Sequence, residues 1–313
     1  MMVKNMTRRQ SLALLGSTAL AAAPTKSAWP VCMFSKHFQW TDVAEMTRLC
    51  AQIGFDGIDL TLRPGGHIEP AQVDSELPRA LATIHAAGLV TPMVTAGILD
   101  ATTPHAESVM QALKKAGIAR YRWGGFKYDA KRPLPMQLAE LKPKLKDLAA
   151  MNKQYGLCAM YHTHSGVNYI GASMWDLYEL LKDHSPDQLS VNLDVGHATA
   201  EGGYGGWIHS TRLLGPLTRG IALKDFLWAK EGKGWHPGWC ALGQGMVNFK
   251  QFLPMIKAAG FQGPVQLHYE YPELGGIDTG KKDLTLTKER VVAIFKRDLE
   301  ACRAVLREAG MGA

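Results

Sequence analysis

Histidine and carboxylate side chains stand at the ends of two short apolar runs in this chain of 313 residues. His162 and His164 close one run, and His268 and Glu270 close another. Alternate residues of a β-strand face the same side, and we expect at least one member of each pair to point into a shared site. Imidazole and carboxylate ligands together suit Mn²⁺, Zn²⁺ or Fe²⁺. The pattern therefore predicts a divalent metal ion that acts as a Lewis acid.

The other apolar runs also end in polar residues. Buried polar groups without partners would destabilise a fold, so their gathering at the run ends favours a functional site. Tryptophans lie in or beside the same segments, and their flat faces can stack on a sugar ring. The polar residues are Lys36, His67, Asp194, His197 and Lys224, and the tryptophans are Trp123, Trp207, Trp228, Trp235 and Trp239.

The runs that carry these residues alternate with longer stretches of helical period. Eight such alternations in residues 29–313 predict an α/β fold, a single (β/α)₈ TIM barrel, whose active site lies at the carboxyl ends of the strands. An open doubly wound sheet is the alternative, but no GxGxxG motif follows an early strand. The expected strands are 31–34, 57–62, 90–95, 120–123, 158–162, 190–194, 220–224 and 265–268. The expected helices include 43–53, 76–87, 108–116, 137–154, 175–182, 248–259 and 288–307.

The amino terminus is typical of an export signal. Arg8 and Arg9 precede a short apolar stretch, and Ala19-Leu20-Ala21 provides small residues for a signal peptidase. The paired arginines resemble a twin-arginine signal. We predict that residues 1–28 are a signal peptide with a short linker and that the mature protein is periplasmic. The alternative is a frayed helix with two chance arginines.

Composition excludes several classes of protein. The formal net charge is +7, but Lys4, Arg8 and Arg9 belong to the predicted signal. The other basic residues are scattered, whereas nucleic-acid-binding proteins need a clustered basic stripe. No apolar run is long enough for a membrane span in the mature protein. Five cysteines without CxxC spacing make a disulfide framework improbable, so a packed core must stabilise the fold.

Six stretches resemble, in order and spacing, the sugar phosphate isomerase/epimerase family with a xylose-isomerase-like barrel. They cover nearly all of the expected mature chain. The stretches are GFDGIDL (54–60), YHTHSG (161–166), LDVGH (193–197), LKD (223–225), LGQGMVNF (242–249) and GPVQLHYEY (263–271).

The resemblance implies a metal site with an altered set of ligands. Family members hold one divalent ion with Glu, Asp, His and Glu from strands five to eight. Asp194 matches the family's Asp, and His197 matches its substrate-contacting His. His162 and His268 stand where the family has Glu, and Ala222 stands where it has His. The resemblance to the family implies that His162, Asp194 and His268 are the metal ligands, with Glu270 or His164 as alternates.

The altered ligands bear on the expected reaction. Two-sided epimerisation uses two carboxylates on opposite faces of the substrate, and at least one of them is replaced by His here. The resemblance therefore implies an isomerase/epimerase-like enzyme that acts on an unphosphorylated sugar or keto-sugar through an enediolate. The expected catalytic residues are His197, Lys224 and Glu270, although Lys224 can instead pair with Asp225. The expected substrate-binding residues are Lys36, His67, Trp123, His164, Glu201 and Trp228.

Other functions remain open from the sequence. A keto-glycoside lyase would use the same enediolate chemistry for β-elimination. A non-catalytic periplasmic carbohydrate-binding protein would explain the missing ligands as lost chemistry. An apurinic-endonuclease-like nuclease shares the barrel but needs more metal ligands and a basic groove. We expect a small carbohydrate as the partner, no nucleic acid, and a chain able to form a homo-oligomer.

Overall fold

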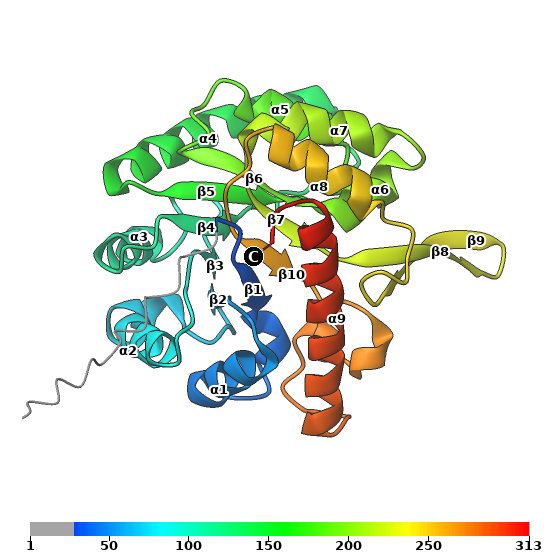
Figure 1. The fold of residues 1–313 in the computed structure, drawn as a ribbon. Helices are drawn as coiled ribbons and strands as arrows, with labels where there is room; N and C mark the ends of the chain where they lie inside the picture. The colour runs from blue at the N-terminus through cyan, green and yellow to red at the C-terminus, as the bar shows by residue number, and fades with distance from the viewer. Residues whose placement is uncertain (1–27, 313) are drawn as a thin grey trace, which may run out of the picture.

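A computed structural model of the protein describes residues 28–312. Eight parallel strands close into a barrel in the order β1-β10-β7-β6-β5-β4-β3-β2, and helices surround it (Figure 1). This arrangement confirms the predicted TIM barrel. Apart from residue 28, the predicted signal peptide lies outside the described residues. The barrel strands are β1 (Val31–Phe34), β2 (Gly57–Leu62), β3 (Val94–Ala96), β4 (Arg120–Trp123), β5 (Cys158–His162), β6 (Leu189–Asp194), β7 (Thr218–Leu223) and β10 (Val265–Leu267).

The surrounding helices have clear local signals at their ends. Asp42 caps the first helix by accepting the backbone N–H of Glu45 at 2.8 Å. Gly54 ends the same helix with φ 102°, a left-handed conformation that favours glycine. The helices are α1 (Val43–Ile53), α2 (Val73–Ala86), α3 (Ala106–Lys115), α4 (Leu134–Tyr155), α5 (Trp175–Leu181), α6 (Val195–Gly202), α7 (Gly206–Leu214), α8 (Phe249–Ala258) and α9 (Lys288–Glu308). No helix within residues 28–312 is long and apolar enough to cross a membrane.

The third strand is shorter than predicted. It begins at Val94, whereas Val90 forms only an isolated bridge with Gly57. Pro92 lies between them and has no backbone N–H to give to a ladder. The prediction of a strand from residue 90 was therefore wrong at its start.

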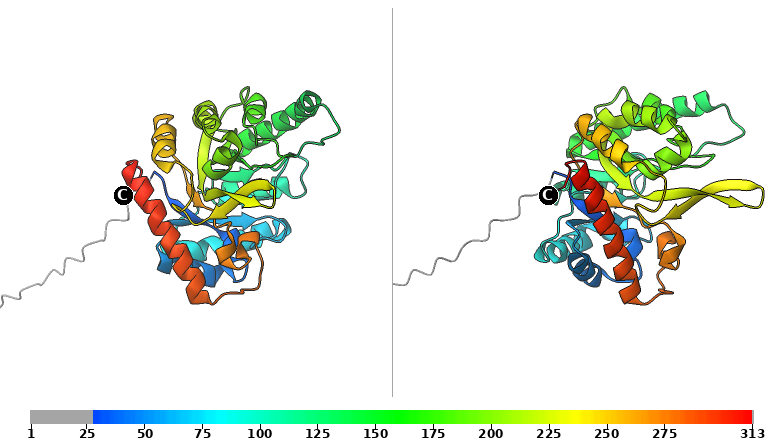
Figure 2. Two further views of the ribbon diagram at one scale, coloured as in Figure 1. Left: turned by 90° about the vertical axis from the view of Figure 1, so that its right-hand side faces the viewer. Right: turned by 45° about the vertical axis from the view of Figure 1, so that its right-hand side comes forward.

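A β-hairpin that the sequence analysis did not predict projects from the barrel. Strands β8 (Asp225–Glu231) and β9 (Gly234–Cys240) pair antiparallel, and Figures 1 and 2 show them extending beyond the helices. The two turn residues include Gly232 with φ 58°, and a two-residue turn of the Gly-X type is a hairpin signal. The hairpin follows β7 directly, so its base lies beside the carboxyl ends of the strands.

Candidate active site

Three side chains meet at the carboxyl ends of strands β5, β6 and β10. His162 ends β5, Asp194 ends β6, and His268 follows β10 directly. One nitrogen or oxygen atom from each lies within 4.8 Å of the others. Asp194 Oδ2 is 3.8 Å from His162 Nε2 and 3.7 Å from His268 Nδ1. The structure thus brings together all three residues that the resemblance implied as metal ligands.

The hydrogen bonding of this triad fits a metal ion. Asp194 Oδ1 accepts the backbone N–H of His197 at 3.0 Å. Among the described residues, however, Asp194 Oδ2 and both ring nitrogens of His268 are buried without a hydrogen-bond partner. Such orphaned atoms are costly unless something else satisfies them. A divalent cation bound by these atoms would do so.

The protonation states also suit a cation. Burial lowers the pKa of His162 and of His268 well below the usual histidine range, so both rings are neutral at pH 7. Burial raises the pKa of Asp194 to about 6, and the nearby charge of Lys224 opposes the rise. At pH 7 the triad therefore offers two neutral imidazoles and a carboxylate, the donor set expected for Zn²⁺, Mn²⁺ or Fe²⁺.

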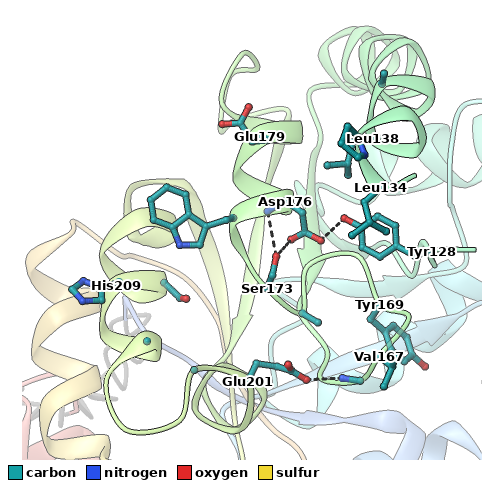
Figure 3. A pocket seen from close by; sticks show the side chains of 18 of the residues that line it. Tyr128, Leu134, Leu138, Val167, Tyr169, Ser173, Asp176, Glu179, Glu201 and His209 are labelled. Carbon is teal, nitrogen blue, oxygen red and sulfur yellow. Dashed lines mark hydrogen bonds between the residues drawn. The ribbon is translucent and has the colours of Figure 1, made fainter. Parts of the chain in front are cut away.

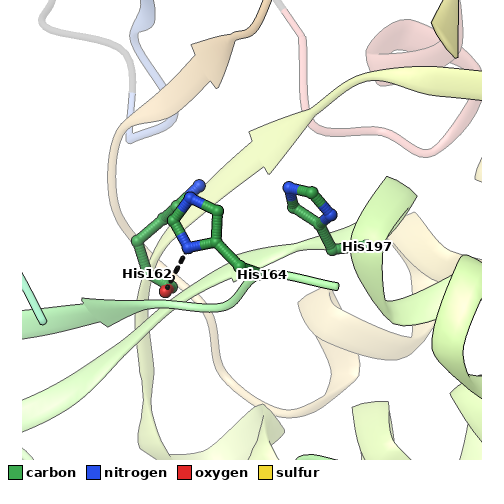
Figure 4. Close-up of side chains that lie close together, drawn as sticks. All are labelled: His162, His164 and His197. Atoms are coloured by element: carbon green, nitrogen blue, oxygen red, sulfur yellow. Dashed lines mark hydrogen bonds between the residues drawn. The ribbon is translucent and has the colours of Figure 1, made fainter. Parts of the chain in front are cut away.

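A second group of three histidines overlaps the triad. His162, His164 and His197 also have ring nitrogens within 4.8 Å of one another, and Figure 4 shows how they lie. His164 donates from Nδ1 to the carbonyl oxygen of His162 at 3.2 Å, and its ring stacks on Tyr169. Burial lowers the pKa of His164 to about 3. This ring is therefore neutral at pH 7 and lies beside the triad, and its role as an alternate ligand stays a prediction.

Lys224 joins the predicted catalytic residues into one chain of contacts. Its Nζ lies 2.6 Å from His197 Nε2, 2.8 Å from Glu270 Oε2 and 3.8 Å from Asp194 Oδ2. Lys36 Nζ lies 3.0 Å from the other oxygen of Glu270. Burial would raise the pKa of Glu270, but the positive charges of Lys224 and Lys36 outweigh it and hold that pKa well below its usual range. Glu270 is therefore ionised at pH 7.

Lys224 does not pair with its neighbour Asp225. The Asp225 carboxylate instead accepts backbone N–H groups from Phe226, Gly243, Gly245 and Val247. These bonds tie the base of the hairpin to the segment that precedes α8. The suggested Lys224–Asp225 pair was wrong because the backbone takes up the carboxylate.

The ring of His197 is held from both sides. Its Nδ1 accepts the backbone N–H of Ser165 at 3.0 Å and lies 2.7 Å from the Ser165 hydroxyl. Burial lowers the pKa of His197 well below the usual range. The side chain is thus a neutral imidazole whose Nε2 faces Lys224.

The tryptophans divide into core and site residues. Trp123 is 2% exposed, donates its indole N–H to the Leu99 carbonyl and packs against Tyr161. It has almost no surface for a sugar, so its expected stacking role is not supported by its position. Trp228 is 40% exposed on the hairpin. Trp239, one of the tryptophans expected near the barrel mouth, lies over the site: its ring centroid is 3.9 Å from Lys224 Nζ and 4.9 Å from the ring centroid of His197.

Two other expected substrate-binding residues hold loops. His67 lies 3.1 Å from Thr61 Oγ1 and 3.3 Å from the Phe38 carbonyl, which joins the segments after β1 and β2. Glu201 accepts the backbone N–H of Gly166 at 2.7 Å. Each residue therefore has a structural partner at the mouth of the barrel.

Arg122 and Phe34 complete the site and were not among the expected residues. Phe34 stacks on His268 with ring centroids 5.0 Å apart, and the Arg122 guanidinium lies 5.1 Å from the Phe34 centroid. The pKa of His162 is lowered mainly by burial and secondly by the positive charge of Arg122. The positions of both residues at strand ends were the only signal in the sequence.

A groove of about 1210 Å³ lies outside the ring of strands, at the same end of the barrel. Tyr169 and Glu201 line it, and so do Val167 and Ser173 of the loop between β5 and α5 (Figure 3). Because Tyr169 stacks on His164, that loop contacts the groove and the histidine cluster together. The aromatic and charged residues of the lining are Tyr128, Lys142, Tyr169, Trp175, Asp176, Glu179, Glu201 and His209.

Comparisons with known proteins agree with this architecture. The family model described as a xylose isomerase-like TIM barrel matches residues 47–290. A search of curated proteins finds no significant match.

Solved structures similar to this chain share its fold at low sequence identity. A xylose isomerase-like TIM barrel protein from Mycobacterium smegmatis in complex with magnesium is 15% identical, with a TM-score of 0.62 over 88% of this chain and 100% of that one. D-psicose 3-epimerase with D-tagatose from Clostridium cellulolyticum H10 is 14% identical, with a TM-score of 0.64 over 88% and 99%. The IolI protein with a bound zinc atom is 15% identical, with a TM-score of 0.66 over 88% and 98%.

Proposed function

Because this chain belongs to the xylose isomerase-like TIM barrel family, we propose that it is a metal-dependent sugar isomerase/epimerase-like enzyme. Its substrate would be an unphosphorylated sugar or keto-sugar that reacts through an enediolate. The observation that carries the proposal is the buried triad with its orphaned atoms, placed directly against Lys224. One solved relative is an epimerase with D-tagatose, and two others hold magnesium or zinc.

The ion would be held by His162, Asp194 and His268. When bound, it would supply a Lewis acid that polarises a substrate carbonyl. The three side chains meet at the carboxyl ends of the strands, where TIM barrels bind their substrates. The substrate carbonyl would therefore lie at the barrel mouth.

His197 and Lys224 are the acid and base candidates in this proposal. Their side-chain nitrogens lie 2.6 Å apart. Because His197 Nδ1 accepts the Ser165 N–H, the neutral ring carries its proton on Nε2 and is the acid candidate, and the Lys224 amine is the base candidate. Glu270, held ionised between Lys224 and Lys36, fixes the position of Lys224. Trp239 covers the pair and reduces the access of water.

A proton-transfer experiment tests this function. The metal-loaded protein is incubated in deuterated buffer with a panel of unphosphorylated ketoses and keto-glycosides, and NMR follows the loss of the C–H signal beside the carbonyl. Exchange that disappears in Lys224→Met would support the proposal. If the sugars bind without any exchange, the protein is a carbohydrate-binding barrel instead.

The groove favours one second candidate, a keto-glycoside lyase. The groove is lined by aromatic rings and carboxylates, and its lining residue Tyr169 stacks on His164, so it provides room for the second sugar of a glycoside. β-Elimination would release the second sugar and leave an unsaturated keto-sugar, which absorbs in the ultraviolet.

Trp175 lines the groove and is 57% exposed. In the lyase, Trp175→Ala would raise KM for a keto-glycoside but leave exchange on a keto-monosaccharide unchanged; an equal effect on both substrates would argue against it.

A further inference from the structure

Four polar side chains fill the barrel interior beneath the triad. Asn192 on β6, Gln266 on β10, Asp59 on β2 and Thr95 on β3 are each at most 2% exposed. Branched aliphatic residues usually occupy such positions in TIM barrels. Polar groups are unfavourable there unless each one is hydrogen-bonded, so this layer requires a reason.

The four side chains form one chain of hydrogen bonds that ends on a proposed ligand. Thr95 donates to Asp59 Oδ2 at 2.7 Å, and Gln266 Nε2 donates to the same oxygen. Asn192 Nδ2 donates to Gln266 Oε1 and lies 3.2 Å from His162 Nδ1. The layer is therefore connected to His162 through Asn192.

This contact determines which nitrogen of His162 carries the proton. An amide NH₂ group can only donate, so Nδ1 must accept, and the neutral ring then carries its proton on Nε2. Nε2 is the nitrogen that lies 3.8 Å from Asp194 Oδ2. A protonated ring nitrogen has no lone pair for a cation, so this arrangement is a metal-free one.

The carbonyl oxygen of the Asn192 amide would favour the other tautomer of His162, with the proton on Nδ1. Among residues 28–312, Asn192 Oδ1 has no hydrogen-bond partner, and a Cβ atom added at Gly220 would lie 2.9 Å from it. A metal-bound histidine normally donates its second N–H to an oxygen acceptor. If the Asn192 amide turned over, Oδ1 would become that acceptor.

We propose that Asn192 is a positioning residue that sets the tautomer of His162: its amide turns when the site is loaded, accepts Nδ1–H and leaves Nε2 free for the ion. The inference rests on the proposed metal-dependent function. Gln266 would turn with it and donate from Nε2 to Asn192 Oδ1. Protonated Asp59 would then donate to Gln266 Oε1.

The environment of Asp59 is compatible with that last bond. Burial raises its pKa to about 7, against hydrogen bonds and positive charges that would lower it. A protonated carboxyl group is therefore accessible near neutral pH, and every member of the layer keeps a partner in both arrangements.

Two measurements test the proposal. In protein labelled with ¹⁵N on the histidine rings, His162 is expected to carry its proton on Nε2 without metal and on Nδ1 with zinc. In chelator competition, Asn192→Leu, which has neither donor nor acceptor, is expected to weaken zinc binding about 10- to 100-fold. Asn192→Asp, which always offers an acceptor, should bind zinc at least as tightly as the wild type.

Asn152 provides the matched control. It is also fully buried, but it contacts Tyr121 and the Gln188 carbonyl instead of the triad. Asn152→Leu and Asn152→Asp should leave the zinc Kd within about twofold of the wild type. An unchanged Kd in Asn192→Leu, or an Nε2 proton on His162 in the zinc-loaded wild type, would overturn the proposal. A wild type that binds no zinc would instead refute the proposed function itself.

Discussion

Nδ1 of His268 lies 3.7 Å from Oδ2 of Asp194, and neither atom has a hydrogen-bond partner within the described part of the chain. The separation is too long for a hydrogen bond. Two buried polar atoms that face each other in this way are stabilised if both bind one cation. The account of this protein as a metal-dependent enzyme depends on that relationship.

Glu270→Gln is expected to slow substrate proton exchange about 100-fold or more, because Lys224 and Lys36 lose the charge that holds them. Zinc content should remain near the wild-type value, since Glu270 is outside the triad. NMR exchange rates and metal analysis check both statements. Glu273→Gln is the control, because that carboxylate pairs with Arg290 and Arg297. Wild-type exchange in Glu270→Gln would contradict the assignment of Lys224.

Trp123→Ala and Trp239→Ala are expected to have different effects. Trp123 is buried against Tyr161 and Phe126, so its truncation should cost ~3–5 kcal/mol of unfolding free energy in urea titrations. Trp239 covers Lys224, so its truncation should impair substrate exchange more than stability. If Trp239→Ala behaved like Trp123→Ala in both assays, Trp239 would be only a core residue.

The metal-free protein is expected to lose stability as the pH falls below 6.5. Burial, followed by the charge of Lys36, lowers the pKa of His37 to about 3. Between pH 6.5, the ordinary pKa of histidine, and pH 3, the unfolded chain binds a proton that the folded chain does not. The free energy of unfolding therefore falls as the pH is lowered through this range. His37 contributes roughly 1.4 kcal/mol per pH unit to this slope.

His37→Gln tests that contribution. Nε2 of His37 accepts the backbone N–H of Tyr269 at 3.1 Å, and a glutamine oxygen can replace it without titrating. Urea titrations in the presence of a chelator should show a shallower fall in stability between pH 6.5 and pH 4. An unchanged slope would show that His37 is not among the buried histidines that cause the fall in stability.

Export is a prediction about residues outside those that the structure describes. Replacing Arg8 and Arg9 with lysine should retain the precursor in the cytoplasm if the segment is a twin-arginine signal. Fractionation with an antibody against the barrel measures this. Normal export of the double variant would refute the twin-arginine assignment.

The sequence was sufficient to predict the barrel and the meeting of three candidate metal ligands at its mouth. Apolar runs with glycine-terminated helices predict strand and helix positions locally, and parallel strands bring the residues at their ends together. His162, Asp194 and His268 could therefore be placed together without knowledge of side-chain contacts.

The remaining site features depend on contacts that the sequence pattern does not encode. Trp239 reaches Lys224 because it lies at the base of the hairpin, where it pairs with Phe226, and the short Gly-Lys turn of that hairpin was a weak signal. Trp123 stands at a strand end like the true site residues but is packed inward. Asn192 and Gln266 lie within strands predicted to be apolar, so nothing local marks them as partners of His162.

The most direct test is the metal content of the purified wild-type protein beside Asp194→Asn, measured by mass spectrometry after exposure to equal Zn²⁺, Mn²⁺ and Fe²⁺. Asp194→Asn keeps an oxygen for the backbone N–H of His197 but removes the negative charge from the triad. The account predicts about one ion per wild-type chain and nearly none in the variant. Equal metal content in the two proteins, or a folded wild type that binds none, would contradict it.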